Sequence, residues 1–222
     1  MSYGAAFTKW RDHSAAWSEY TDHAFVRGLA DGSLPREAFL HYLRQDYVFL
    51  IHFSRAWALA VTKSDTLAEM QAAAGTVDGL VNHEMALHVE TCAAVGISQA
   101  ELEATVERAE NMAYTRFVLE AGYSGDLLDL LAALAPCVLG YGEIGKRLGK
   151  TATSDAYKDW IGTYAGDEYQ EVCTSVGNLI DNALTSRLGG DYMSLPRWQS
   201  LTQTFEKATV LEVRFWDMGL TP

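Results

Sequence analysis

The sequence predicts an all-α, single-domain multi-helix bundle that covers residues 1–222. Three observations lead to this prediction. Only 4 of the 222 residues are proline, and long stretches rich in alanine and leucine lack turn signals. Hydrophobic residues make up 49% of the chain and charged residues 21%, a composition typical of globular domains. No β-hairpin pattern, glycine-rich phosphate loop, sequence repeat or linker interrupts the helical pattern.

Capping and breaking residues set the ends of seven predicted helices. Pro35 and Pro196 stand in first turns, where proline is tolerated. Ser98 and Glu101 form a capping box, and Pro136 predicts a bend within the fifth helix. The predicted helices span about residues 3–29, 34–63, 67–95, 98–122, 126–148, 154–188 and 195–218.

Charge and cysteine usage exclude several classes of protein. The net charge is −12, from 17 basic and 29 acidic residues, which opposes a nucleic-acid partner because phosphate binding needs a basic patch. No apolar stretch reaches the length of a membrane span, and no secretory signal begins the chain, so no membrane partner is expected. The three widely spaced cysteines form neither a disulfide framework nor a metal pair. We therefore predict a soluble, cytoplasmic protein in a reducing compartment.

Several predicted helices carry ionisable residues on their apolar stripes. Asp46 is the one acid of the second stripe, Glu212 breaks the last stripe, and Cys137 lies with Tyr141 on the fifth. The stripes are Phe39, Leu43, Asp46, Leu50, Phe53, Trp57, Ala60; Leu67, Met70, Ala74, Val77, Val81, Glu84, His88; Leu127, Leu130, Leu134, Cys137, Tyr141, Ile144, Leu148; Tyr157, Ile161, Tyr164, Glu168, Val172, Ser175, Leu179; and Leu201, Phe205, Ala208, Glu212, Phe215.

Acids on facing stripes suggest a polar pocket inside the bundle, because an unpaired buried carboxylate costs several kcal/mol. Structural explanations remain open at this point. Either acid can pair with a basic residue or reach water, a buried cysteine is usually an inert small hydrophobe, and Tyr141 and Tyr164 can be core tyrosines. Periodicity alone names no reaction.

A metal site is not predicted. His83 and His88 are five residues apart and diverge on a helix, which does not match the zincin spacing. Glu84 and His88 are four apart, whereas a ferritin-like site needs two Glu-x-x-His pairs. All 6 histidines lie in the first 90 residues, so the last four helices offer none. His88 is expected to be a hydrogen-bonded structural or pocket-lining residue.

Four segments of the sequence together resemble the TenA/thiaminase II family, which has a haem-oxygenase-like helical fold. The resemblance covers nearly the whole chain, and its segments occur in the same order on helices of matching length. These segments are Gln45–Tyr47 with His52–Phe53, Pro136–Gly145, Trp160–Tyr164 and Glu212–Met218.

The resemblance implies an aminopyrimidine aminohydrolase of thiamin salvage or metabolism, a hydrolase of C–N bonds that needs no cofactor. Its expected substrates are 4-amino-5-aminomethyl-2-methylpyrimidine, which becomes the hydroxymethyl compound, and thiamin, which is cleaved to pyrimidine and thiazole. The implied roles are Cys137 as nucleophile, Asp46 as the acid that holds the pyrimidine, Glu212 as acid/base, Tyr141 and Tyr164 around the nucleophile, and Tyr114 and Phe215 as stacking rings. A homo-oligomer, a tetramer, is also implied.

One residue departs from the family pattern. Phe49 occupies the substrate-binding position where a tyrosine is common, and its missing hydroxyl would hydrogen-bond near the thiol. Tyr141, one turn from Cys137, is a candidate donor that favours the thiolate. Two alternatives stay open: a non-catalytic pyrimidine-binding or regulatory member of the fold, favoured by Phe49, and a metal-dependent oxygenase, opposed by the histidine distribution.

Overall fold

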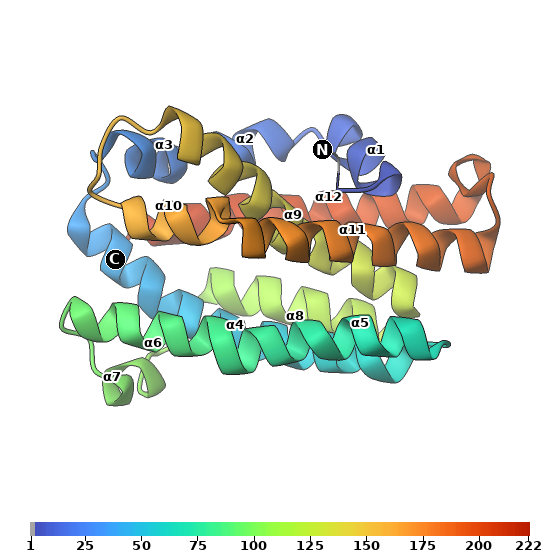
Figure 1. Cartoon of the computed structure of the whole chain (residues 1–222), viewed down its shortest axis with the longest axis horizontal. Coiled ribbons are helices and arrows are strands. Elements are labelled where there is room, and N and C mark those ends of the chain that lie inside the picture. Colours follow the sequence, from blue (N-terminus) through green and yellow to red (C-terminus); the bar gives the residue numbers. More distant parts are fainter. Residues whose placement is uncertain (1–2) are drawn as a thin grey trace.

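The computed structural model describes residues 3–222, and every regular element among them is a helix (Figure 1). The predicted all-α class is therefore confirmed. The elements are α1 (Ala5–His13), α2 (Trp17–Thr21), α3 (Ala24–Asp31), α4 (Arg36–Lys63), α5 (Leu67–Asp78), the π-helix η1 (Gly79–Glu84), α6 (Met85–Ala94), α7 (Gln99–Glu103), α8 (Ala109–Ser124), α9 (Leu127–Thr151), α10 (Lys158–Ala165), α11 (Asp167–Leu188), the 3₁₀ turn η2 (Tyr192–Ser194) and α12 (Pro196–Gly219).

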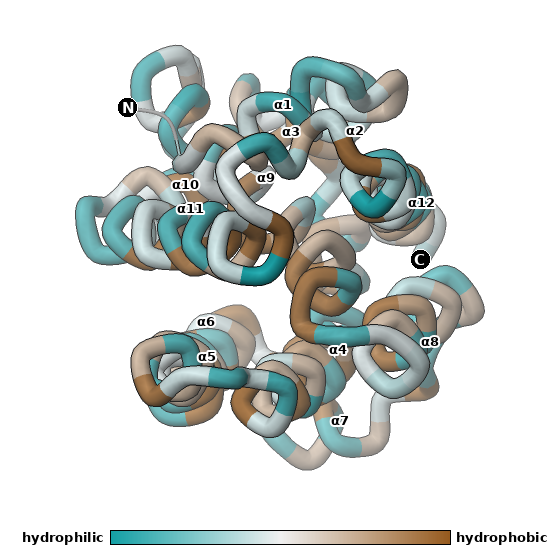
Figure 2. Tube along the Cα trace, turned by 90° about the vertical axis from the view of Figure 1, so that its right-hand side faces the viewer, coloured by the Kyte–Doolittle hydropathy of each residue, from teal (hydrophilic) through white to brown (hydrophobic). Residues whose placement is uncertain are grey.

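The helices form two groups that meet along α4 and α9. Figure 2 shows α4 to α8 in one group, and α1 to α3 with α9 to α12 in the other. Helix α9 packs against α8, α10, α11 and α12, while α4 packs against α5 and α8. The two long helices also contact each other, so side chains from both groups can converge beside α9.

Helix α9 forms the centre of the core. It is long and apolar enough to span a membrane, but 83% of its most apolar window is buried inside the bundle, as expected for a core helix. The helix continues through Pro136, and the carbonyl of that residue accepts a hydrogen bond from the Tyr20 hydroxyl at 3.2 Å. At Gly145 a Cβ atom would collide with the backbone of Tyr164, so the glycine allows α10 to lie close against α9.

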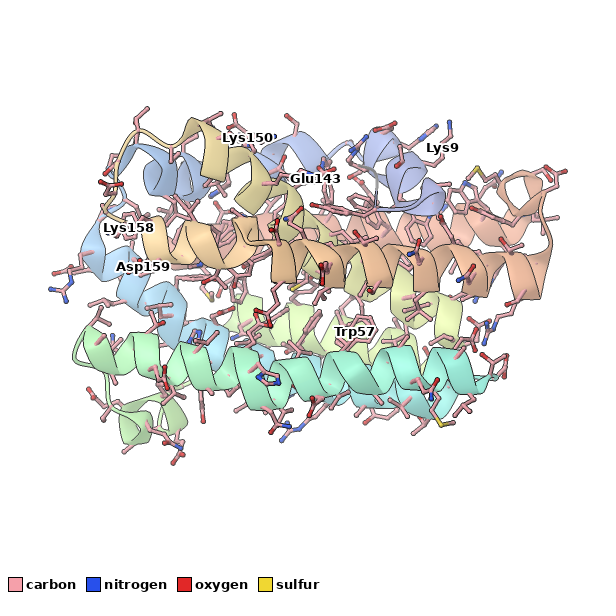
Figure 3. The ribbon with its side chains drawn as sticks, viewed as in Figure 1. Lys9, Trp57, Glu143, Lys150, Lys158 and Asp159 are labelled. Atoms are coloured by element: carbon pink, nitrogen blue, oxygen red, sulfur yellow. The ribbon has the colours of Figure 1, made fainter. Side chains whose placement is uncertain are left out.

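Large aromatic side chains fill the interior. Trp57 on α4 is fully buried and points into the bundle, whereas Lys9, Lys150 and Lys158 lie on the outer surface (Figure 3). Burying one such ring stabilises the fold by roughly 1.5–3 kcal/mol relative to its exposure. The bundle is therefore held together mainly by apolar burial across the helix interfaces.

The first predicted helix is wrong in its continuity. Residues 3–29 form the three short helices α1, α2 and α3. The His23 ring caps α3 by accepting the Phe25 N–H at 3.2 Å. The breaks allow all three short helices to pack against α12, which one straight helix could not do.

The fourth and sixth predicted helices are also broken, by tertiary contacts and by Gly166. The predicted capping box of Ser98 and Glu101 is present, but it opens only the five-residue α7. The next loop is held on α4 by Gln45, which donates to the Val106 carbonyl at 2.9 Å and accepts from the Arg108 N–H at 3.0 Å. Gly166 has an extended backbone and separates α10 from α11.

These irregularities displace two predicted apolar stripes. After the break at Gly166 the helical phase restarts, so Glu168 is exposed and Cys173 is buried instead. In the third predicted helix the π-helix η1 shifts the phase, because it holds more residues per turn than an α-helix. Leu67 and Val81 are consequently 69% and 50% exposed, and the buried side of α5 contains Glu69 and Ala73.

Candidate active site

Three of the predicted stripes bring ionisable residues together beside α9. The stripes of α4, α9 and α12 face the core as predicted, with Asp46 5% and Glu212 1% exposed. Cys137 on α9 is half-buried. The charges of both acids raise the pKa of this thiol, so the three groups lie in one neighbourhood although they are far apart in sequence.

Asp46 has a neutral histidine and a tyrosine as its neighbours. His88 Nδ1 lies 3.5 Å from Asp46 Oδ2, and His88 Nε2 lies 2.8 Å from the Leu43 carbonyl. Because that carbonyl only accepts, we assign the proton to Nε2. Burial lowers the pKa of His88. Burial also raises the pKa of Asp46 to about 7, with the Tyr42 hydrogen bond opposing.

Glu212 is held by Tyr114. The Tyr114 hydroxyl donates to Glu212 Oε1 at 2.8 Å in the fully buried interior. Burial raises the pKa of Glu212 to about 8, the hydrogen bond from Tyr114 lowers it, and the charge of Asp46 raises it again. A carboxyl with such a pKa exchanges its proton near neutral pH, as acid–base catalysis requires. Tyr114, expected only as a stacking ring, therefore also orients this acid.

The thiol of Cys137 is protonated in the free protein. Burial, followed by the charges of Glu212, Glu84 and Asp46, raises its pKa well above the usual value. Within residues 3–222 no side chain donates a hydrogen bond to the Cys137 Sγ. The hydroxyl of Tyr141 is hydrogen-bonded with Tyr42 instead, so the resting geometry does not make Tyr141 the donor to the thiol.

Aromatic rings surround the acids and the thiol. The Phe49 ring lies 5.2 Å from the Tyr114 ring and 5.3 Å from the Phe215 ring, measured between centroids. Tyr141 and Tyr164 meet edge to face with centroids 5.0 Å apart. Such rings offer flat apolar contact next to polar groups, the environment that suits a planar heterocycle with a polar edge.

Two further residues belong to this neighbourhood and were not predicted to be site residues. Glu84, at the end of η1, and Tyr169, in the first turn of α11, both act electrostatically with Cys137. The Tyr169 hydroxyl donates to the Val138 carbonyl at 3.2 Å. Glu84 stands on the predicted third stripe, but periodicity gave it no role. Tyr169 could not be found because the predicted phase continued through Gly166.

We call Asp46, Glu84, Cys137 and Glu212 the acid–thiol cluster. Its carboxyls have neither a lysine nor an arginine partner within the described part of the chain. The same residues provide no group of three or more His, Cys, Asp or Glu side chains arranged to hold a metal ion. The cluster can therefore bind and protonate, and its thiol can act as a nucleophile once its proton is removed.

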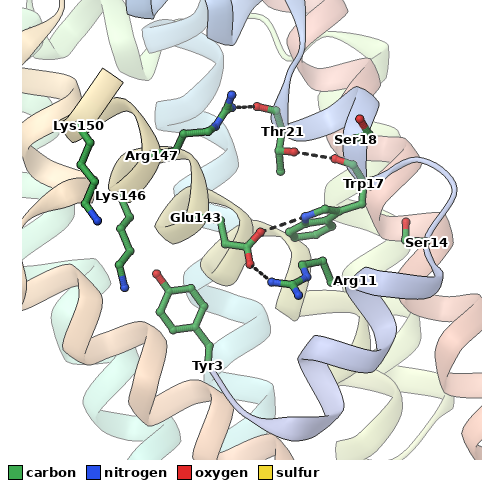
Figure 4. Close-up of a pocket in the computed structure, with 10 residues that line it drawn as sticks. All are labelled: Tyr3, Arg11, Ser14, Trp17, Ser18, Thr21, Glu143, Lys146, Arg147 and Lys150. Atoms are coloured by element: carbon green, nitrogen blue, oxygen red, sulfur yellow. Dashed lines mark hydrogen bonds and ion pairs between the residues drawn. The ribbon is translucent and has the colours of Figure 1, made fainter. Parts of the chain in front are cut away.

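A second polar region, the basic groove, lies on the outer face of α9. It has a volume of about 700 Å³, and Figure 4 shows Arg147 and Glu143 bonded to neighbours. Glu143 accepts from Arg11 at 2.6 Å and from Trp17 at 3.1 Å, while Arg147 bonds the Thr21 carbonyl. The groove is lined by Tyr3, Arg11, Ser14, Trp17, Ser18, Thr21, Glu143, Lys146, Arg147 and Lys150.

The basic groove contains none of the predicted site residues. Both of its arginines bond acceptors from the same region, Arg11 with Glu143 and Asp12 and Arg147 with Thr21 and Asp22. It has no cysteine and no buried carboxyl that titrates near neutral pH. These pairs connect α9 to α1 and α2, and the groove is a structural contact region.

The class of protein defined by the fold and the site is an all-α bundle with a buried acid–thiol cluster. The chain belongs to the TENA/THI-4/PQQC family, whose model matches residues 10–221. It is 34% identical to an aminopyrimidine aminohydrolase of Halalkalibacterium halodurans, over 99% of this chain and 96% of that protein. The predicted family is confirmed, and the predicted class of C–N hydrolase agrees with the name of this relative.

Solved structures agree with the fold. The crystal structure of a protein described as a TenA family transcription regulator, from Silicibacter sp. TM1040, is 68% identical with a TM-score of 0.98, covering 99% of this chain and 98% of that one. A TenA homologue of P. horikoshii OT3 is 26% identical with a TM-score of 0.86, over 97% and 98% of the two chains.

Proposed function

We propose that this chain is an aminopyrimidine aminohydrolase. Its substrate would be 4-amino-5-aminomethyl-2-methylpyrimidine, converted to the hydroxymethyl compound, with thiamin as a second substrate. The observation that carries the proposal is the convergence of Cys137 with buried carboxyls that have no basic partner. The 34% identity to an aminopyrimidine aminohydrolase supports it, as does the cytoplasmic, single-domain character predicted from the sequence.

The ring of the substrate would lie against Phe49, Tyr114 and Phe215, with its polar edge at Asp46. Asp46 has a pKa of about 7, so it can donate to a ring nitrogen when protonated and accept from the exocyclic amine when ionised. Each hydrogen bond to a charged group contributes about 1.5–3 kcal/mol. Tyr141 and Tyr164 would close the side of the site next to α10.

The reaction would proceed through a covalent adduct. Glu212 accepts the thiol proton, the Cys137 sulfur bonds to the electron-poor ring, and the C–N bond to the departing group breaks. The departing group leaves as ammonia from its ammonium form and takes the proton from Glu212. Water then adds hydroxide to the methylene and gives its proton to Glu212, which returns it as the C–S bond breaks.

For thiamin the same steps would release the neutral thiazole. No proton is required by that departing group, so the proton from Glu212 goes to solvent. Because the thiol pKa is raised in the free protein, thiolate formation would depend on bound substrate. A positive charge beside the sulfur offsets the effect of the surrounding carboxyls.

Ammonia release from the aminomethyl-pyrimidine tests the proposal. Wild-type protein should release ammonia, Cys137→Ala should lose at least about 10³-fold in kcat, and Cys92→Ala should stay within a few-fold of wild type. Full turnover by Cys137→Ala would rule out the covalent mechanism. Loss of activity with an iron chelator would instead support a metal-dependent reaction.

A second candidate function is that of a regulatory protein that binds the pyrimidine without turning it over. The description of the 68% identical relative as a transcription regulator and the phenylalanine at position 49 favour it. Binding of the aminomethyl-pyrimidine without ammonia release would support this function. A homotetramer stays a prediction that sedimentation can test.

A further inference from the structure

Glu84 reaches the acid–thiol cluster because of the π-helix η1. The turn Gly79–Glu84 shifts the helical phase, so Val81 is 50% exposed while Glu84 and His88 face the bundle. Glu84 raises the pKa values of Cys137, Tyr164 and Tyr169. These residues stand on α9, α10 and α11, so the carboxyl points across the bundle. Figure 1 shows the α5–α6 rod running along α10 and α11.

Glu84 lies on the accessible side of the cluster. Glu84, Cys137 and Tyr169 are half-buried, whereas Asp46, Glu212 and Tyr114 are buried. A molecule that enters from solvent therefore meets Glu84 and Tyr169 first and the other two acids last. With the pyrimidine held at Asp46 and the aromatic rings, its departing group lies at the thiol and leaves past Glu84.

No cation of the described chain neutralises this carboxyl. Glu84 forms no ion pair with Lys, Arg or His, and its nearest charged influence is the like charge of Asp46. Burial and Asp46 raise the pKa of Glu84 to about 8. An unpaired acid of this kind is unfavourable until a cation comes close, and the cation must then come with the ligand.

Both proposed substrates carry positive charge on the departing group. The aminomethyl group is an alkylammonium at neutral pH, like that of lysine with a pKa of about 10.4, and thiamin carries a thiazolium. The hydroxymethyl product has lost this charge. We propose that Glu84 binds the cationic departing group and thereby determines specificity for substrates that carry a positive charge next to the scissile C–N bond.

This role rests on the proposed function and deepens it. Binding the cation would stabilise the ionised form of Glu84 and oppose the effect of the acids on the Cys137 thiol. The same interaction disappears when the neutral alcohol forms, so the product is held less tightly than the substrate. Glu84 would thus favour both thiolate formation and product release.

The test compares a charged and a neutral ligand in Glu84→Gln, which keeps the shape of the side chain and removes its charge. Kinetics of ammonia release give kcat and KM for the aminomethyl-pyrimidine, and calorimetry gives Kd for it and for the hydroxymethyl-pyrimidine. We expect KM and Kd for the amine to rise about tenfold or more, with Kd for the alcohol within twofold of wild type. Glu90→Gln, an exposed acid on α6, is the matched control and should change neither ligand.

Three outcomes would overturn the role of Glu84. Equal losses for amine and alcohol would mean that Glu84 shapes the pocket without reading charge. Unchanged values for both, with an active wild type, would reject Glu84 and leave the proposed function intact. A wild-type protein that neither binds nor turns over the amine would reject both. Thermal unfolding of Glu84→Gln checks that the variant is folded.

Discussion

Two groups of charged side chains use opposite faces of the same helix, and they satisfy their charges in opposite ways. In the basic groove, Glu143 of α9 pairs with Arg11 and also accepts from Trp17. In the acid–thiol cluster, Asp46, Glu84 and Glu212 gather around Cys137 without a lysine or arginine partner in the part of the chain that the structure describes. Positions 137 and 143 point in opposite directions because a helix turns by about 100° per residue.

The difference shows where the fold carries an electrostatic cost. Exposed ion pairs are worth about 0–1 kcal/mol each, so the basic groove contributes little and loses little. Buried carboxyls without counter-charges keep their protons or destabilise the fold. Side chains that impose such a cost are explained by a ligand that removes it, which the basic groove does not require.

The comparison is tested most strongly by neutralising one acid in each region. Glu212→Gln removes the group proposed to move protons, and kcat for ammonia release should fall about 10²–10⁴-fold. Glu143→Gln makes the same chemical change on the other face of α9 and should keep kcat within twofold. Similar losses in both variants would remove the distinction between the two regions.

The stability of the protein should depend on pH through the acid–thiol cluster. The folded pKa of Glu212, about 8, lies above its ordinary value, so the folded state holds this proton more tightly than the unfolded chain. That stabilisation is complete at acid pH below the ordinary value and is lost as pH rises through about 8. Wild-type Tm should therefore fall between pH 5 and pH 9, with Asp46 and Glu84 adding to the fall.

Glu212→Gln should reduce this dependence. Its Tm should be close to that of wild type at pH 5 and several degrees higher at pH 9, because glutamine cannot ionise and still accepts the hydrogen bond from Tyr114. Glu143→Gln should shift Tm equally at both pH values. A Glu212→Gln variant that falls in Tm as steeply as wild type would show that this carboxyl does not ionise in the cold folded state or on heating.

The sequence predicted the acid–thiol cluster where helices are regular, and failed where they are not. Asp46, Cys137 and Glu212 lie on long helices with an unbroken α period, so their facing stripes were predicted correctly. Tyr169 was missed because the chain reverses at Gly166, and the stripe of α5 was displaced by the π-helix η1. The basic groove was not predicted, because pairs such as Arg11–Glu143 depend on how α1 breaks away and packs.

A smaller effect is expected at Phe49, inside the wall of the proposed site. Phe49→Tyr adds a hydroxyl that can hydrogen-bond near the thiol, and a neutral hydrogen bond of about 0.5–1.5 kcal/mol corresponds to a two- to tenfold rise in kcat. Phe53→Tyr, one turn along α4 in the same aromatic stack, is the control and should not raise kcat. An unchanged kcat in Phe49→Tyr would mean that this position shapes the slot without activating Cys137.

The smallest effect is expected on the stability of the basic groove. Glu143→Gln removes an ion pair in which Arg11 is still 32% exposed and Glu143 27% exposed, so the free energy of unfolding should fall by only about 0.5–1 kcal/mol. The loss should shrink in 1 M salt, because the Debye length there is about 3 Å. Urea unfolding at two salt concentrations measures both values. A salt-independent loss above about 2 kcal/mol would mean that the pair with Arg11 and the bond from Trp17 act as a buried network, and the basic groove would then resemble the acid–thiol cluster in cost although not in chemistry.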